Sequence, residues 1–160
     1  MAAETVTFSP AALEKVQEIL GRYPTRQAAL MPVLWLAQRE FGWLSPEVRA
    51  YVADLLGLSP ATVEGVASFY TMYHKRPPGR HVIWLCGSIS CMLLGHERIQ
   101  QHLEQKLGIR VGETTPDGRF SLFMTECIGG CGTAPAMLVD DDYHDRLTPE
   151  RVDEILEKYP

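Results

Sequence analysis

The sequence lacks several features that mark common classes of protein. It has no excess of basic residues, because 15 lysines and arginines stand against 20 aspartates and glutamates, for a formal net charge of -5. Proteins that bind nucleic acid usually carry a basic excess, so this class is disfavoured. The sequence also has no uninterrupted apolar run of the length that a membrane-spanning helix needs. Its 46% hydrophobic residues are enough for a packed core.

Targeting signals are missing as well. Residues 1–6 have neither the basic start and apolar centre of a secretory signal nor the arginine-rich character of a transit peptide. We therefore expect a cytoplasmic protein of a bacterium or archaeon. Cysteine is scarce, with four among 160 residues. In a cytoplasmic chain such cysteines are more often metal ligands or redox groups than structural disulfides.

Two short motifs with well-understood chemistry are also absent. There is no G-x-G-x-x-G fingerprint, so we do not expect the chain to bind a dinucleotide by itself. There is no C-x-x-C pair, which disfavours a thiol redox enzyme.

The first half of the chain predicts helices. Ser-Pro pairs at 9–10, 45–46 and 59–60 suit helix starts, because serine caps an orphan backbone N–H and proline needs no partner at the next position. Apolar residues at helical spacing predict another helix over 28–41, with Pro32 in its first turn. The first helix is expected to end near Gly21, ahead of Pro24, and two others at Gly42 and Gly57.

The pattern changes after an expected linker at residues 75–80 (KRPPGR), where strands alternate with helices. The two longer strands are joined by a helix, so they should be parallel with a right-handed crossover. This is the layout of a minimal thioredoxin-like domain. The fold class is therefore α/β, with an N-terminal helical bundle over residues 1–78 and a thioredoxin-like α/β domain over 79–160. The expected elements are strands at 81–86 and 120–127, helices at 95–107 and after Thr148, and a hairpin around 140–142.

Four cysteines form the most informative pattern, as two pairs: Cys86 with Cys91, and Cys127 with Cys131. Each pair follows the carboxyl end of a predicted strand. If the strands are parallel neighbours, both pairs emerge at the same edge of the sheet and their sulfurs converge on one point. The loops are rich in glycine, which lets backbone N–H groups approach thiolates and inorganic sulfide.

Several kinds of site fit this pattern. A [2Fe–2S] cluster with four cysteine ligands tolerates the wide first pair, because a two-iron core is longer than one ion. A structural zinc site with four cysteines is the second possibility, although zinc favours closer pairs. Four unrelated buried cysteines are disfavoured, because the cysteines pair at two strand ends.

The sequence resembles the thioredoxin-like [2Fe–2S] E subunits of respiratory NADH:quinone oxidoreductase (complex I). The resemblance combines several motifs and spans most of the chain. The matching segments are EGVASFY at 64–70, CGSISCMLLG at 86–95, GETTPDG at 112–118 and ECIGGCGTAP at 126–135.

This resemblance implies that Cys86, Cys91, Cys127 and Cys131 ligate a [2Fe–2S] cluster. It also implies an electron-transfer subunit that is not active alone, beside a flavoprotein partner that binds NADH and FMN. Other subunits of the complex's peripheral arm would be further partners. The expected location is cytoplasmic, at the inner face of the cell membrane through the complex. Related subunits occur in NAD-linked hydrogenases and formate dehydrogenases.

Overall fold

The computed structural model describes residues 6–160. The expectation that the N-terminus carries no targeting signal concerns residues 1–6. Of these, residues 1–5 lie outside the described residues. The chain divides into two compact units between Pro77 and Pro78, inside the expected linker. Within residues 6–160, no helix combines the length and apolar character needed to cross a bilayer.

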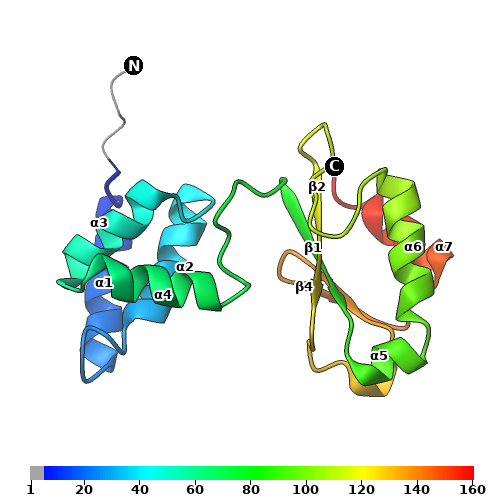
Figure 1. The fold of residues 1–160 in the computed structure, drawn as a ribbon, viewed down its shortest axis with the longest axis horizontal. Helices are drawn as coiled ribbons and strands as arrows, with labels where there is room; N and C mark the ends of the chain where they lie inside the picture. The colour runs from blue at the N-terminus through cyan, green and yellow to red at the C-terminus, as the bar shows by residue number, and fades with distance from the viewer. Residues whose placement is uncertain (1–5) are drawn as a thin grey trace. The chain divides into compact units, whose positions relative to one another are not determined.

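Over residues 6–77, the first unit is a bundle of four helices (Figure 1). Three of them begin at the Ser-Pro pairs, where the hydroxyls of Ser9, Ser45 and Ser59 accept hydrogen bonds from backbone N–H groups three residues on. Buried aliphatic residues from all four helices form the core. The helices are α1 (Pro10–Arg22), α2 (Leu30–Phe41), α3 (Pro46–Leu56) and α4 (Pro60–Phe69).

Helix α1 ends at Arg22, near Gly21 as expected, and helix α2 ends at Phe41, just before Gly42. Helix α3 ends at Gly57, whose φ of 61° is the left-handed conformation that glycine adopts without strain. Helix α2 begins two residues later than expected, at Leu30, and Pro32 lies in its first turn. The predicted N-terminal helical bundle is therefore confirmed.

The second unit is a four-stranded mixed sheet in the order β2-β1-β3-β4. Strand β1 pairs with β2 in parallel and with β3 antiparallel, and β3 pairs with β4 antiparallel. The predicted parallel pair is thus confirmed. The strands are β1 (His81–Cys86), β2 (Phe120–Thr125), β3 (Met137–Val139) and β4 (Asp142–His144), and the helices are α5 (Ile89–Leu93), α6 (His96–Leu107), the 3-10 turn η1 (Cys131–Thr133) and α7 (Pro149–Leu156).

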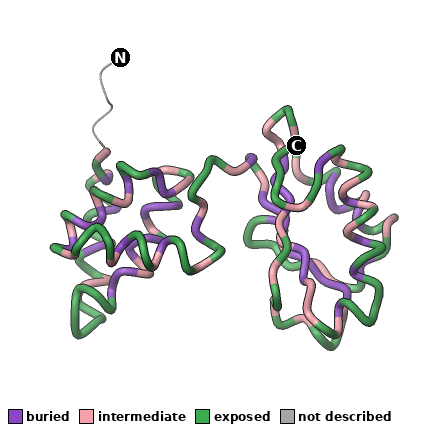
Figure 2. Tube along the Cα trace, in the orientation of Figure 1, coloured by how far each residue is buried: buried purple, intermediate pink, exposed green. Residues whose placement is uncertain are grey.

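The sheet buries one face against α6 and α7 (Figure 1). Alternate strand residues, such as Ile83 and Leu85 of β1, point toward Ile99 and Leu103 of α6, as the two-residue period of a strand requires. Figure 2 shows the buried positions of this unit concentrated along the central strands and the helix faces. This core holds the carboxyl ends of β1 and β2 side by side.

Alanine in place of Gly79 should destabilise the second unit by about 1–3 kcal/mol. A Cβ there would lie 2.8 Å from the backbone carbonyl carbon of Phe120 and 3.0 Å from the backbone nitrogen of Ser121, and neither can swing away. The Gly79 N–H also donates to the Ser121 hydroxyl at 2.7 Å.

Gly21→Ala is the matched control, because a Cβ at Gly21 meets no atom within 4 Å. It should be neutral or slightly stabilising, since alanine favours helix. Urea denaturation followed by circular dichroism compares the two variants. Equal midpoints would show that the close approach at Gly79 carries no strain.

Candidate metal centre

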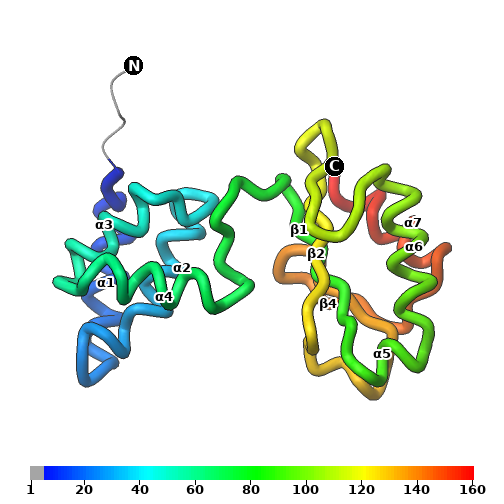
Figure 3. Tube along the Cα trace, viewed as in Figure 1, coloured from blue at the N-terminus to red at the C-terminus, as the bar shows by residue number. Residues whose placement is uncertain are grey.

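The four cysteines lie where the two parallel strands end. Cys86 is the last residue of β1, and Cys91 lies on α5 immediately beyond it. Cys127 follows β2 by two residues, and Cys131 opens η1. Figure 3 shows α5 and the loop after β2 together at one end of the sheet. The structure therefore brings all four predicted residues to the same edge.

Burial divides the cysteines into two kinds. Cys86 and Cys91 are 2% and 1% exposed, whereas Cys127 and Cys131 are exposed. All four are free thiols. The site therefore has a dry half, built by β1 and α5, and a solvent-facing half, built by the loop after β2.

The environment of Cys86 favours its thiolate. Burial acts to raise its pKa, but hydrogen bonds from the backbone N–H groups of Ser88 and Ile128 and from the Cys91 and Cys127 thiols lower the pKa below its ordinary value. Backbone groups of both ligand loops therefore favour the Cys86 thiolate, and the Cys86 thiol donates to the Glu126 carbonyl at 3.8 Å.

Cys91 behaves in the opposite way. Burial and the hydrogen bond with Cys86 raise the pKa of its thiol to about 11, and the charge of Cys131 acts in the same direction. The four sulfurs are therefore close enough to influence one another. On the exposed side, the Gly129 N–H donates to the Cys127 sulfur at 3.3 Å.

Within the described part of the chain, no three histidine, cysteine, aspartate or glutamate side chains are placed to hold one metal ion. The convergence of the four sulfurs on one point stays a prediction.

Contacts at two glycines shape the ligand loops. A Cβ at Gly87 would lie 2.9 Å from the Met124 sulfur, so the first loop passes tightly over β2. A Cβ at Gly130, between the second pair of cysteines, would collide with the hydroxyl of Tyr143 from β4. The glycine-rich composition indicated close approaches, but no local signal in the sequence identified Met124 or Tyr143.

Helix α5 was not expected from the sequence, which predicted only a loop there. It has five residues, too few to show a helical period. Its outer side chains and the next residue form an apolar surface beside Cys91, between 48% and 76% exposed. We call this surface the apolar rim, and its members are Ile89, Met92, Leu93 and Leu94.

The sequence was compared with models of known protein families. The model of the thioredoxin-like [2Fe–2S] ferredoxin family matches residues 16–160. The chain belongs to this family. Its fold is therefore the expected thioredoxin-like α/β fold, preceded by the helical bundle.

Relatives of this [2Fe–2S] ferredoxin carry consistent names. The NADH-quinone oxidoreductase E subunit numbered 2 in Rhizobium meliloti is 47% identical over 91% of this chain and 87% of its own length. The E subunit of the Escherichia coli enzyme is 41% identical over 98% of this chain and 94% of its own. An NAD+-reducing [NiFe]-hydrogenase in the H2-reduced state is similar in structure, with a TM-score of 0.72 and 28% identity. That match covers 81% of this chain and 22% of the hydrogenase chain.

The residues of this ferredoxin fit the cluster that the family name specifies. A [2Fe–2S] cluster takes four thiolates, two on each iron. The structure offers four free thiols at one edge of the sheet, as two pairs at the ends of the neighbouring strands β1 and β2. Backbone N–H groups already point at the sulfurs of Cys86 and Cys127.

Proposed function

We propose that this chain is the electron-transferring E subunit of an NADH-quinone oxidoreductase, and that Cys86, Cys91, Cys127 and Cys131 hold its [2Fe–2S] cluster. The observation that carries this proposal is the pairing of four free thiols at the ends of two neighbouring parallel strands. The names of the relatives at 47% and 41% identity support the assignment to the complex. When bound, the cluster takes up and releases one electron.

The two halves of the site have different tasks. Cys86 and Cys91 exclude water from one side, which limits hydrolysis and oxidation there. Cys127 and Cys131 face outward, on the side from which an electron can arrive. The backbone N–H groups of Ser88, Ile128 and Gly129 stabilise negative charge on the thiolates without adding a titratable group.

The partner in this proposal is a flavoprotein subunit that binds NADH and FMN, within the peripheral arm of the complex. The apolar rim supports docking close to the site, because contiguous exposed apolar side chains favour a protein interface. Residues 87–95 and 128–136 carry no charged side chain, so covering them requires no charge to be buried. The chain alone is not a catalyst, and it reaches the membrane only through the complex.

A second candidate is the corresponding subunit of an NAD-linked hydrogenase. The structural similarity to the NAD+-reducing [NiFe]-hydrogenase supports it. Affinity purification from the native cell separates the two candidates. Recovery of quinone oxidoreductase subunits supports the first, and recovery of a nickel-containing subunit supports the second.

Metal analysis tests the cluster itself. We expect two irons and two acid-labile sulfides per chain after anaerobic purification or reconstitution, as a [2Fe–2S] cluster requires. The protein should be coloured, because ferric iron bound to thiolate absorbs visible light whereas zinc thiolate does not. One zinc per chain, with no iron after reconstitution, would instead support a zinc-stapled interaction module.

A further inference from the structure

The side chain of Tyr143 lies against the second ligand loop from outside it. Tyr143 belongs to β4, where it pairs with Leu138 of β3. Its hydroxyl is 3.0 Å from the hydroxyl of Thr133, the last residue of η1. A Cβ at Gly130 would collide with that hydroxyl and lie 3.1 Å from the ring carbon that carries it. Tyr143 therefore contacts the loop both between the two cysteines and just after Cys131.

Backbone hydrogen bonds extend this contact along the chain. The Arg146 N–H donates to the Thr133 carbonyl at 2.8 Å, and the Leu147 N–H donates to the Pro135 carbonyl at 3.1 Å. The stretch 143–147 thus holds the stretch 130–135 at three places. A loop with three glycines between residues 129 and 132 loses much conformational freedom when it is ordered, so such support matters.

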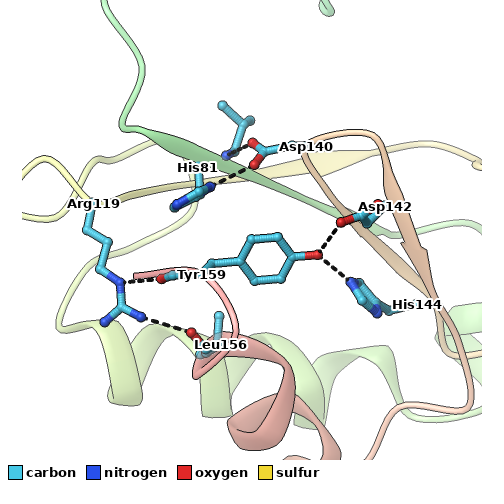
Figure 4. Close-up of polar contacts among 8 residues, drawn as sticks. His81, Arg119, Asp140, Asp142, His144, Leu156 and Tyr159 are labelled. Atoms are coloured by element: carbon cyan, nitrogen blue, oxygen red, sulfur yellow. Dashed lines mark hydrogen bonds and ion pairs between the residues drawn. The ribbon is translucent and has the colours of Figure 1, made fainter.

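The opposite side of β4 is itself anchored (Figure 4). Asp142 and His144 flank Tyr143 and point to the other face of the strand, where both contact the hydroxyl of Tyr159. Tyr159 donates to Asp142 at 2.8 Å and lies 3.0 Å from the His144 Nε2.

Arg119 completes this anchor from the start of β2. Its Nε and Nη2 donate to the carbonyls of Tyr159 and Leu156, at 2.7 and 2.9 Å (Figure 4). Arg119 therefore links the C-terminal segment to the sheet. Tyr159 links that segment to β4 through its hydroxyl.

We propose that Tyr143 is a positioning residue for the exposed half of the cluster site. It acts through Gly130 and Thr133, which set the path of the loop that carries Cys127 and Cys131. The anchor at Tyr159 holds β4 and so keeps Tyr143 in place. This inference rests on the proposed function, because it requires these two cysteines to be ligands.

Four variants test the proposal: Gly130→Ala, Tyr143→Phe, Tyr143→Ala and the double variant Gly130→Ala with Tyr143→Ala. The Cβ of alanine at position 130 must displace the tyrosine ring, which breaks its hydrogen bond with Thr133. Gly132→Ala is the matched control, since a Cβ there meets no atom within 4 Å. The readouts are the rate of iron loss to a chelator and the EPR spectrum of the reduced protein.

We expect Gly130→Ala and Tyr143→Ala each to speed iron loss about threefold to tenfold, the effect of losing roughly one hydrogen bond. Tyr143→Phe should show how much of the faster iron loss is caused by the missing hydroxyl. The double variant should be no worse than Tyr143→Ala alone, because both changes remove the same support. The EPR spectrum should change in the Gly130 variant and stay the same in Gly132→Ala.

Two results would overturn the proposal. Equal iron loss in Gly130→Ala and Gly132→Ala would show that the tyrosine contact does not matter, while the proposed function would stand. Additive effects of the Gly130 and Tyr143 changes would show that they act separately. Iron and sulfide content of the unsubstituted chain distinguishes these results from failure of the proposed function, which would appear as absence of any cluster. Tyr143→Phe keeps the ring, so it remains informative if Gly130→Ala misfolds.

Discussion

Alanine in place of Cys91 should abolish the visible absorbance of the reconstituted protein. Cys91 is 1% exposed, so solvent has little access to replace the ligand that the iron would lose. Loss of a ligand should exceed the roughly 10- to 100-fold fall in metal affinity that loss of an outer-shell partner causes. Cys86→Ala should behave in the same way, because Cys86 is also buried. Iron content and absorbance after anaerobic reconstitution give the measurement.

Replacement by serine should have a smaller effect at the exposed cysteines than at the buried ones. Serine at Cys127 or Cys131 presents an oxygen where water also has access, so these variants should keep part of their iron. Serine at the buried positions should keep little. Ser90→Ala controls for a neighbouring change on α5 that removes no sulfur. A full cluster in both Cys86→Ala and Cys91→Ala would refute the ligand assignment.

The reduction potential should be low, near roughly −400 mV, as in plant-type centres with four cysteine ligands. Two ferric ions, two sulfides and four thiolates sum to a charge of −2, which reduction makes −3. Cys86 and Cys91 are buried, and low-dielectric surroundings stabilise the added charge poorly. No lysine or arginine lies within residues 87–95 or 128–136 to offset it. Backbone N–H groups offset only part of the added negative charge.

The potential should also vary little with pH near neutrality. Histidine ligation, as in Rieske centres, raises the potential and couples it to a proton. None of the five histidines lies within residues 87–95 or 128–136. An EPR-monitored titration at several pH values is the measurement. A positive potential, or a steep fall with rising pH, would mean that a histidine is a ligand.

Several elements of the fold could be predicted from short stretches of sequence. The Ser-Pro pairs located the starts of α1, α3 and α4, because a capping hydroxyl and a ring without an N–H act within one helical turn. The apolar run at 81–86 gave the full extent of β1. The strand predicted at 120–127 ends earlier, at Thr125, because Cys127 already belongs to the ligand loop.

Helix α5 could not be predicted in this way. A helix of five residues provides barely more than one turn, so its apolar residues show no period. Ile89 and Leu93 are exposed, which is the reverse of what an apolar residue suggests by itself. Only the burial of Cys91 in the folded chain shows which side of this helix is inside.

The sequence alone therefore predicted the four cysteines of the site and the strands that carry them, because cysteine spacing, capping and strand period are local properties of the chain. Tertiary structure alone decided how the four thiols differ. Cys86 and Cys91 are dry while Cys127 and Cys131 are open, because strand order places β1 at the centre of the sheet and leaves the loop after β2 outside. It also decided that Tyr143 lies against Gly130, since contacts between distant segments depend on how the elements pack.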